Sequence, residues 1–194
     1  MKKVLTGAIL ALTTPLFLSG DVARAGSNGT FEEHQGLWNA LQDVGITMKV
    51  NTPDVCDEDA RGGGAYFTYK RRLVICQDNA KAWDGTQVSW TANDLDTLRH
   101  EGHHVVQDCN EGSMGDGKLA NLFHEEDDLI EWLTKSSWTK DQLVSLMESL
   151  EEDGEDFHDI KLEMEAYTVA SDISATSIAT KVTEFCGKPT KFTF

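Results

Sequence analysis

The sequence predicts a small α+β domain, with a short antiparallel sheet near the N-terminus and a mostly helical C-terminal half. Apolar runs of strand length, bounded by glycine and polar residues, occur before residue 91, whereas helical spacing and N-cap residues dominate after it. No internal repeat or change of composition divides the chain. A length of 194 residues suits one domain with a substantial core.

Residues 1–25 are typical of a secretory signal peptide. Two N-terminal lysines precede a short apolar run at 4–18, and an Ala-x-Ala site ends at Ala25. The apolar run is too short to span a membrane comfortably. We therefore expect cleavage after Ala25, a secreted or periplasmic location, and a single mature domain at 26–194 that is not held in a membrane.

The chain is strongly acidic, with 33 Asp and Glu against 17 Lys and Arg and a net charge of −16. Loss of the leader would remove three basic residues and one acidic residue, which makes the mature chain more acidic still. The electric field of so negative a protein repels phosphate groups. The net charge therefore argues against nucleic acid and anionic membranes as partners. It favours solubility outside the cell and is compatible with cationic substrates.

The first half of the mature chain contains one predicted helix and three predicted strands. Apolar side chains at helical spacing indicate a helix at 31–44, and the pattern at 46–50 suits a strand. A polar loop follows, and three glycines at 62–64 mark a tight or mobile connection. Residues 66–69 and 73–76 then predict a pair of strands joined by a short turn.

The second half is predicted to be helical. One helix is expected to begin near Thr91 or Asn93, both good N-caps, and to run to about residue 109. Three glycines within 111–117 predict a loop. Three further helices are expected, at 119–133, 141–150 and 156–183.

Four cysteines are present, and an even number in an exported chain favours two disulfides. We favour Cys56–Cys76, which closes a loop around the predicted hairpin, and therefore Cys109–Cys186, which ties the helix at 91–109 to the C-terminal region. A cysteine metal site is the alternative, but no C-x-x-C spacing supports it.

Residues 100–104 read His-Glu-Gly-His-His, the most informative segment of the chain. On a helix, His100 and His104 lie four residues apart, so both imidazoles leave the same face about one turn from each other. Two neutral imidazoles at that separation can occupy two positions of a tetrahedral zinc site. Glu101 lies beside that face, where its carboxylate can accept a proton from a metal-activated water. This H-E-x-x-H pattern resembles that of zinc metallopeptidases.

A catalytic zinc site needs a third protein ligand and an open position for water. The other histidines do not lie at the H-x-x-G-x-x-H spacing that an all-histidine site would require; they are His34, His103, His124 and His158. The third ligand is therefore sought among the carboxylates.

Residues 163–170 resemble the third-ligand helix of the gluzincin branch of zinc metallopeptidases, in which a glutamate on a later helix completes the site. The resemblance is closest to the Glu-x-x-Ala-Asp form of CAAX-type proteases and the Glu-x-Glu-Ala-Asp/Asn form of ImmA/IrrE-type peptidases. It implies Glu163 as the third ligand, three positions before Ala166. Mostly small side chains on the same face, extending to Ser174 and Ser177, would let two helices approach closely. Glu165, about 160° around the helix, is the alternative ligand.

Tyr167 stands where these families usually have Asp or Asn, which braces a ligating histidine. It lies one turn after Glu163 on the same face. Its hydroxyl is expected either to brace a ligand or to donate a hydrogen bond to the oxyanion of a tetrahedral intermediate, with a buried core tyrosine as the alternative. Asp108 and Asp172 are candidates for the missing carboxylate.

Together, these residues predict a secreted zinc metalloendopeptidase that acts on peptide or protein substrates. His100, His104 and Glu163 would hold Zn²⁺, and Glu101 would act as the general base. The alternatives are a zinc hydrolase of a non-peptide amide or ester and a non-catalytic zinc-binding module. The acidic run at 124–128 is interpreted as a solvated helix face, and the run at 151–156 as a loop that caps the next helix, with calcium binding as the alternative for each.

Overall fold

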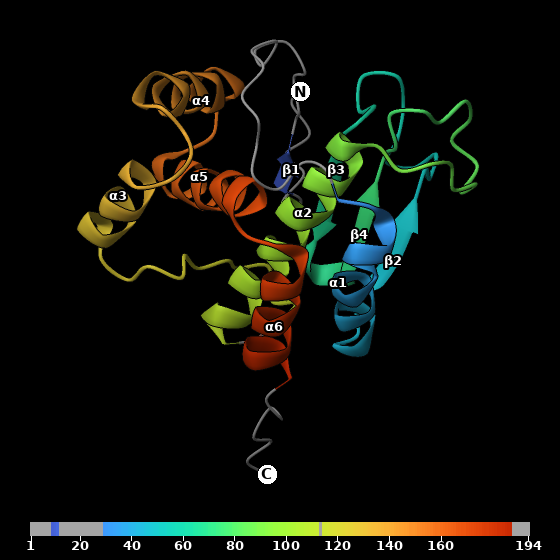
Figure 1. Cartoon of the computed structure of the whole chain (residues 1–194), viewed down its shortest axis with the longest axis horizontal. Helices are drawn as coiled ribbons and strands as arrows, with labels where there is room; N and C mark the ends of the chain where they lie inside the picture. The colour runs from blue at the N-terminus through green and yellow to red at the C-terminus, as the bar shows by residue number, and fades with distance from the viewer. Residues whose placement is uncertain (1–8, 12–28, 113, 188–194) are drawn as a thin grey trace.

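The structure is a computed structural model that describes residues 9–11, 29–112 and 114–187 (Figure 1). Most of the predicted signal peptide, residues 1–25, lies outside the described residues. The elements are β1 (Ile9–Ala11), α1 (Phe31–Asp43), β2 (Thr47–Val50), β3 (Gly64–Phe67), a 3₁₀ turn (Thr68–Lys70), β4 (Arg72–Ile75), α2 (Ala92–Glu111), α3 (Glu126–Thr134), α4 (Lys140–Asp153), α5 (Phe157–Asp172) and α6 (Ala175–Cys186). This is the predicted α+β class, with a helical C-terminal half.

The four described strands form one sheet in the order β1-β3-β4-β2. β3 and β4 form the predicted antiparallel hairpin, and β1 pairs antiparallel with the outer edge of β3. The sheet is mixed, not antiparallel throughout as the sequence suggested, because β2 pairs parallel with β4. The connection at 51–63 carries the chain past the end of β4, so that the following hairpin inserts β4 between β3 and β2.

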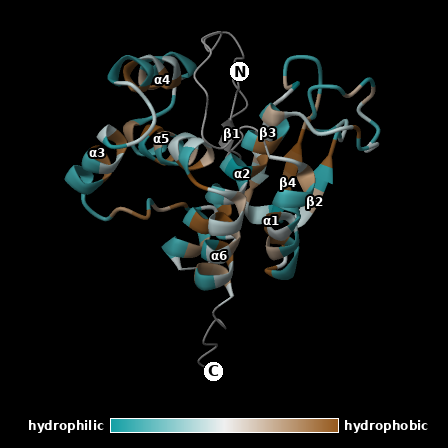
Figure 2. Cartoon of the chain, in the orientation of Figure 1, coloured by the Kyte–Doolittle hydropathy of each residue, from teal (hydrophilic) through white to brown (hydrophobic). Residues whose placement is uncertain are grey.

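Helix α2 lies between the sheet on one side and helices α5 and α6 on the other, and it also contacts α1 (Figure 1). It begins after the N-cap Thr91, whose side chain accepts a hydrogen bond from the backbone amide of Asp94. Its residues are buried almost without interruption from Asp94 to Asp108. Figure 2 shows that the neighbouring strand β4 is largely apolar, as a strand inside a core should be.

Two predicted helices differ from the structure. Residues 119–125 are not helical, and α3 begins only at Glu126. The predicted helix at 156–183 is two helices, because Ile173 is extended (φ −110°, ψ 134°) and Ser174 caps α6 by accepting a hydrogen bond from the Ser177 amide. Ser174 and Ser177 therefore do not extend the small-residue face of α5.

Both favoured disulfides are confirmed, Cys56–Cys76 and Cys109–Cys186, and the described residues contain no free cysteine. The first joins the connection after β2 to the residue that follows β4. The second joins α2 to the end of α6, so it fixes two helices that pack against each other. Within the described part of the chain, no helix is both long enough and apolar enough to cross a membrane.

Candidate metal centre

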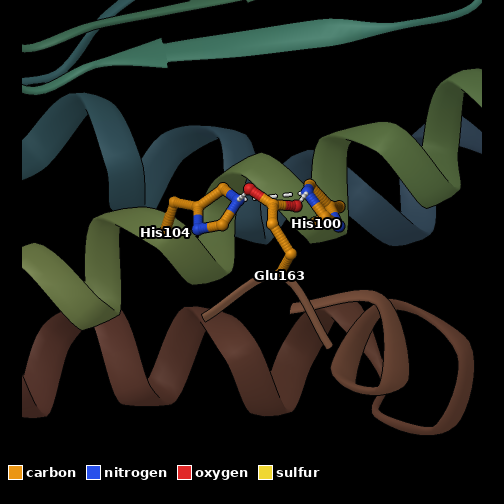
Figure 3. Close-up of side chains that lie close together, drawn as sticks. All are labelled: His100, His104 and Glu163. Carbon is orange, nitrogen blue, oxygen red and sulfur yellow. Dashed lines mark hydrogen bonds and ion pairs between the residues drawn. The ribbon is translucent and has the colours of Figure 1, made fainter. Parts of the chain in front are cut away.

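The side chains of His100, His104 and Glu163 meet in the core between α2 and α5 (Figure 3). The two imidazoles leave α2 one turn apart, and their Nε2 atoms are 3.0 Å from each other. Glu163 enters from α5 with one carboxylate oxygen facing each ring. Its Oε2 lies 3.1 Å from His100 Nε2, and its Oε1 lies 3.3 Å from His104 Nε2.

These distances fit a single divalent cation. Ligand atoms held about 2.1 Å from one tetrahedral zinc ion lie about 3.4 Å from each other, close to the three separations seen here. All three side chains are buried, with at most 4 % of any of them exposed. Neither oxygen of Glu163 has a hydrogen-bond partner. A buried group of two imidazoles and one carboxylate, with its polar atoms turned toward one point, can bind a metal ion.

The electrostatics of the group agree with this interpretation. Burial opposes the charged form of His104, but Glu163 outweighs burial and raises the pKa of His104 to about 9. Burial alone would raise the pKa of Glu163, yet His104 and His100 hold it well below its usual value. Burial lowers the pKa of His100, and Glu163 offsets this only in part. The metal-free centre is therefore a buried ion pair, whose proton a bound cation would replace.

Glu101 lies next to this centre and is completely buried. Neither of its carboxylate oxygens has a hydrogen-bond partner. Burial raises its pKa to about 8, with His104 opposing this rise and Glu163 adding to it. Strand β3 passes directly over the side chain, since a Cβ atom at Gly64 would lie 2.9 Å from Glu101 Cγ. Glu101 is therefore a buried carboxyl group beside the metal group, held where β3 crosses α2.

Gln107 orients His104, a role that was not predicted from the sequence. The Nδ1 of His104 lies 2.7 Å from Gln107 Oε1, and Gln107 Nε2 donates to the backbone carbonyl of Leu162 at 3.1 Å. Because this amide oxygen only accepts, Nδ1 of His104 carries a proton, and Nε2 is the nitrogen that a metal would bind once it replaces the proton shared with Glu163. The signal in the sequence is the spacing, since Gln107 follows His104 by three residues on the same helical face.

Tyr167 packs on the other histidine. Its ring centroid is 4.4 Å from that of His100, with the planes inclined by 56°. Burial, followed by the charges of Glu163 and Glu101, raises the pKa of the phenol, so it stays protonated at neutral pH. Its hydroxyl makes no hydrogen bond to the residues that the structure describes. The predicted position beside the site is observed, but the contact with His100 is through the ring.

The two carboxylates suggested as partners for the histidines serve elsewhere. Asp108 accepts a hydrogen bond from the Tyr66 hydroxyl at 2.6 Å and is also bonded by the Gly115 amide. Asp172 accepts from the Ser137 amide at 2.8 Å. The Nδ1 atom of His100 is buried and has no hydrogen-bond partner.

Glu165, the alternative ligand, points away from the centre. Its Oε1 lies 2.7 Å from His103 Nε2, and its carboxylate also accepts from the Asn121 side chain and the Leu122 amide. These bonds connect α2 and α5 to the segment before α3. Glu165 and His103 thus form a separate buried network, and Glu163 alone of the two glutamates faces the histidine pair.

Residues 30–187 match a family model described as a domain of unknown function, DUF8637. The chain belongs to this DUF8637 family. The matched DUF8637 region begins at Thr30, the N-cap of α1, and ends at Gly187, the C-cap of α6. The family domain therefore coincides with the helices and strands from α1 to α6, and it contains the whole metal centre.

No curated protein and no solved structure matches this DUF8637 chain. What the DUF8637 domain can do must therefore be derived from its own residues. Among the residues that the structure describes, His100, His104 and Glu163 are the one group of three or more side chains arranged to hold a metal.

Proposed function

We propose that this DUF8637 domain is a secreted zinc metallopeptidase of the gluzincin type. The proposal rests on one observation, the meeting of the His100 and His104 Nε2 atoms with the Glu163 carboxylate at 3.0 to 3.3 Å inside the core. Two imidazole nitrogens and one carboxylate oxygen form a donor set that suits zinc, whereas calcium and magnesium prefer oxygen ligands throughout. Three protein ligands also leave a fourth position open, as catalytic zinc sites do.

Glu101 supplies the base that hydrolysis requires. When bound, zinc acts as a Lewis acid that polarises the substrate carbonyl and makes water easier to deprotonate. Glu101 takes a proton from the attacking water and delivers it to the departing amine. A carboxylate held beside the metal group, outside the ligand set, can accept a proton from the attacking water and release it to the leaving group. The protonated phenol of Tyr167, whose ring packs on His100, would donate a hydrogen bond to the oxyanion.

The sheet offers a place for an extended peptide. β3 covers Glu101 at Gly64, and the outer edge of β3 is the edge with which β1 pairs antiparallel. Cleavage of the predicted leader would remove β1 and leave the backbone groups on the outer edge of β3 unpaired, while β4 stays paired with the inner edge. An extended substrate could then pair with this edge, one strand away from the catalytic base. This edge supports a peptide over a small amide or ester, which remains the second candidate.

The decisive variant is Glu101→Gln in the mature chain. Because Glu101 is next to the metal group without belonging to it, the variant should keep its zinc but lose about 100- to 10,000-fold in kcat/KM. Zinc content measured by elemental analysis and cleavage of a mixed peptide library test both expectations. Full activity in the variant would exclude the mechanism. A wild-type protein that binds zinc but cleaves no peptide would favour a non-catalytic zinc-binding module.

A further inference from the structure

Residues 119–122, which are not helical, bridge α2 and α5 through hydrogen bonds to both helices. The Ala120 amide donates to the Gln107 carbonyl of α2 at 3.2 Å. The Leu122 amide donates to the carboxylate of Glu165 on α5, 3.1 Å from Oε2 and 3.2 Å from Oε1. This segment therefore connects the two helices that carry the metal ligands.

Asn121 makes the connection through a single residue. Its backbone carbonyl accepts a hydrogen bond from the Asn110 side chain of α2 at 2.8 Å. Its own Nδ2 donates to the Lys161 carbonyl at 3.0 Å and to Glu165 Oε2 at 2.8 Å, both on α5. An amide nitrogen carries two N–H groups, so these two bonds can form together. Asn121 is therefore bonded to α2 by its backbone and to α5 by its side chain.

These bonds reach α5 on both sides of the third metal ligand, Glu163. Lys161 precedes this ligand by two residues and Glu165 follows it by two. Directly before it, the Leu162 carbonyl accepts a hydrogen bond from Gln107 of α2 at 3.1 Å. The Glu163 carboxylate itself faces the two ligating histidines at 3.1 and 3.3 Å. Its place relative to them depends on where the bonds at the flanking residues hold the backbone of α5.

We propose that Asn121 is a positioning residue of the metal centre, which holds α5 where Glu163 can share one metal ion with His100 and His104. This inference rests on the metal site of the proposed function and adds a residue outside its ligand set. A functional site must hold its groups within about 0.5 Å of the working geometry. Hydrogen bonds are directional, so bonds to a carbonyl and to a carboxylate of α5 fix both the height and the rotation of the helix.

Asn121→Leu removes both side-chain bonds with little change in volume. In zinc titration calorimetry of the mature protein, this variant should bind zinc about 10- to 100-fold more weakly than the wild type. Asn93→Leu is the matched control. The Nδ2 of Asn93 also donates to a carbonyl and a carboxylate, those of Gly62 at 2.8 Å and Asp78 at 3.2 Å, but it joins α2 to the segments beside β3 and β4. The control variant should keep the zinc affinity of the wild type.

A second substitution shows whether Asn121 acts through Glu163. In a Glu163→Ala background, Asn121→Leu should leave the remaining zinc affinity unchanged, because the ligand that it positions is gone. An equal loss of affinity in both backgrounds would overturn the inference, as would wild-type affinity in the single variant. If far-UV circular dichroism shows that Asn121→Leu does not fold, Asn121→Gln replaces it in the same comparison. That variant keeps the amide on a longer side chain, and a smaller loss, again confined to the protein with Glu163, is expected.

The affinities need no substrate, so they separate this inference from the peptidase. Coupling between Asn121 and Glu163 in a protein that cleaves no peptide would sustain the positioning role and reject the peptidase. Independent effects of the two substitutions in a protein that cleaves peptides would reject the positioning role and leave the peptidase in place.

Discussion

His104 is the most tightly constrained residue of the metal centre, because both of its ring nitrogens have a defined neighbour. Gln107 holds Nδ1, and Glu163 and His100 face Nε2. A glutamine in this position fixes the tautomer without adding a third acidic side chain to a site that already contains Glu163 and Glu101. Nε2 of His104 can therefore face a metal, while Glu163 remains available as a ligand and Glu101 stays outside the ligand set.

Replacing Gln107 by Leu should weaken zinc binding about 10- to 100-fold, because His104 loses the partner that orients it. Competition with a chelator of known affinity measures the effect. Gln35→Leu is the matched control, since Gln35 is exposed on α1 and bonds only to Asn39. Equal zinc affinities in all three proteins would show that Gln107 does not orient the ligand.

A second histidine, His34, gives the fold a pH dependence. Its Nε2 lies 2.7 Å from the guanidinium of the buried Arg99, and its Nδ1 lies 2.9 Å from the Thr30 carbonyl. Arginine only donates, so Nε2 must be unprotonated and His34 neutral. Burial, with a smaller contribution from Arg99, accordingly lowers its pKa.

This lowered pKa predicts a loss of stability in acid. The unfolded chain takes up a proton at His34 as the pH falls below about 6.5, whereas the folded state does so only at lower pH. Neutral His34 therefore makes its full contribution to the free energy of unfolding above about pH 6.5, and this contribution declines as the pH falls below 6.5. Urea unfolding of the metal-free protein between pH 8 and pH 5 should therefore show a smaller decline for His34→Gln than for wild type. Identical pH profiles would contradict this role.

At the scale of elements, β3 crosses α2 at close range beside the metal group. A Cβ atom at Gly64 would lie 2.7 Å from Thr97 Cγ2, 2.9 Å from Glu101 Cγ and 3.0 Å from the Val74 carbonyl oxygen. The last of these belongs to the backbone of the adjoining strand and cannot rotate away. Only glycine allows the strand to approach the helix this closely.

Gly64→Ala should therefore push β3 away from α2, costing about 1–3 kcal/mol of stability and at least about tenfold in kcat/KM. Gly36→Ala provides the control, because Gly36 lies within α1 and has no atoms near its Cβ position. That substitution should raise stability by about 0.5–1 kcal/mol and leave activity unchanged. Thermal unfolding measures the stability of both variants, and peptide cleavage measures their activity. A Gly64→Ala variant with unchanged stability and activity would refute the close contact.

The boundaries of two helices could not be predicted from the sequence pattern alone. The apolar period runs on through Ile173, so the sequence indicated one helix where Ser174 begins another. Serine suits both a helix surface and an N-cap, and only the packing of α6 against α1 and α2 selects the cap. Likewise, residues 119–125 had apolar spacing, but backbone and side-chain bonds to Glu165 and Asn110 hold them outside a helix.

For the whole molecule, the sequence predicted the α+β class, because strand runs and helical periods are local signals. The favoured disulfides followed from pairing Cys56 with Cys76 around the predicted hairpin, which left Cys109 and Cys186 for each other. The sequence also singled out His100, His104 and Glu163, which the fold brings together from α2 and α5. The direction of β2, the place of Gln107 and the pairing of Glu165 with His103 depend on contacts between distant segments. No local pattern encodes those contacts.

The most direct measurement is the zinc content of the mature protein and of three single variants. One zinc ion per chain is predicted for the wild type and for Glu165→Gln, whose carboxylate faces His103. Substoichiometric zinc is predicted for His104→Ala and Glu163→Ala, because each removes one of three ligands. A wild type without zinc, or a Glu163→Ala protein that retains it fully while Glu165→Gln loses it, would contradict the metal centre described above.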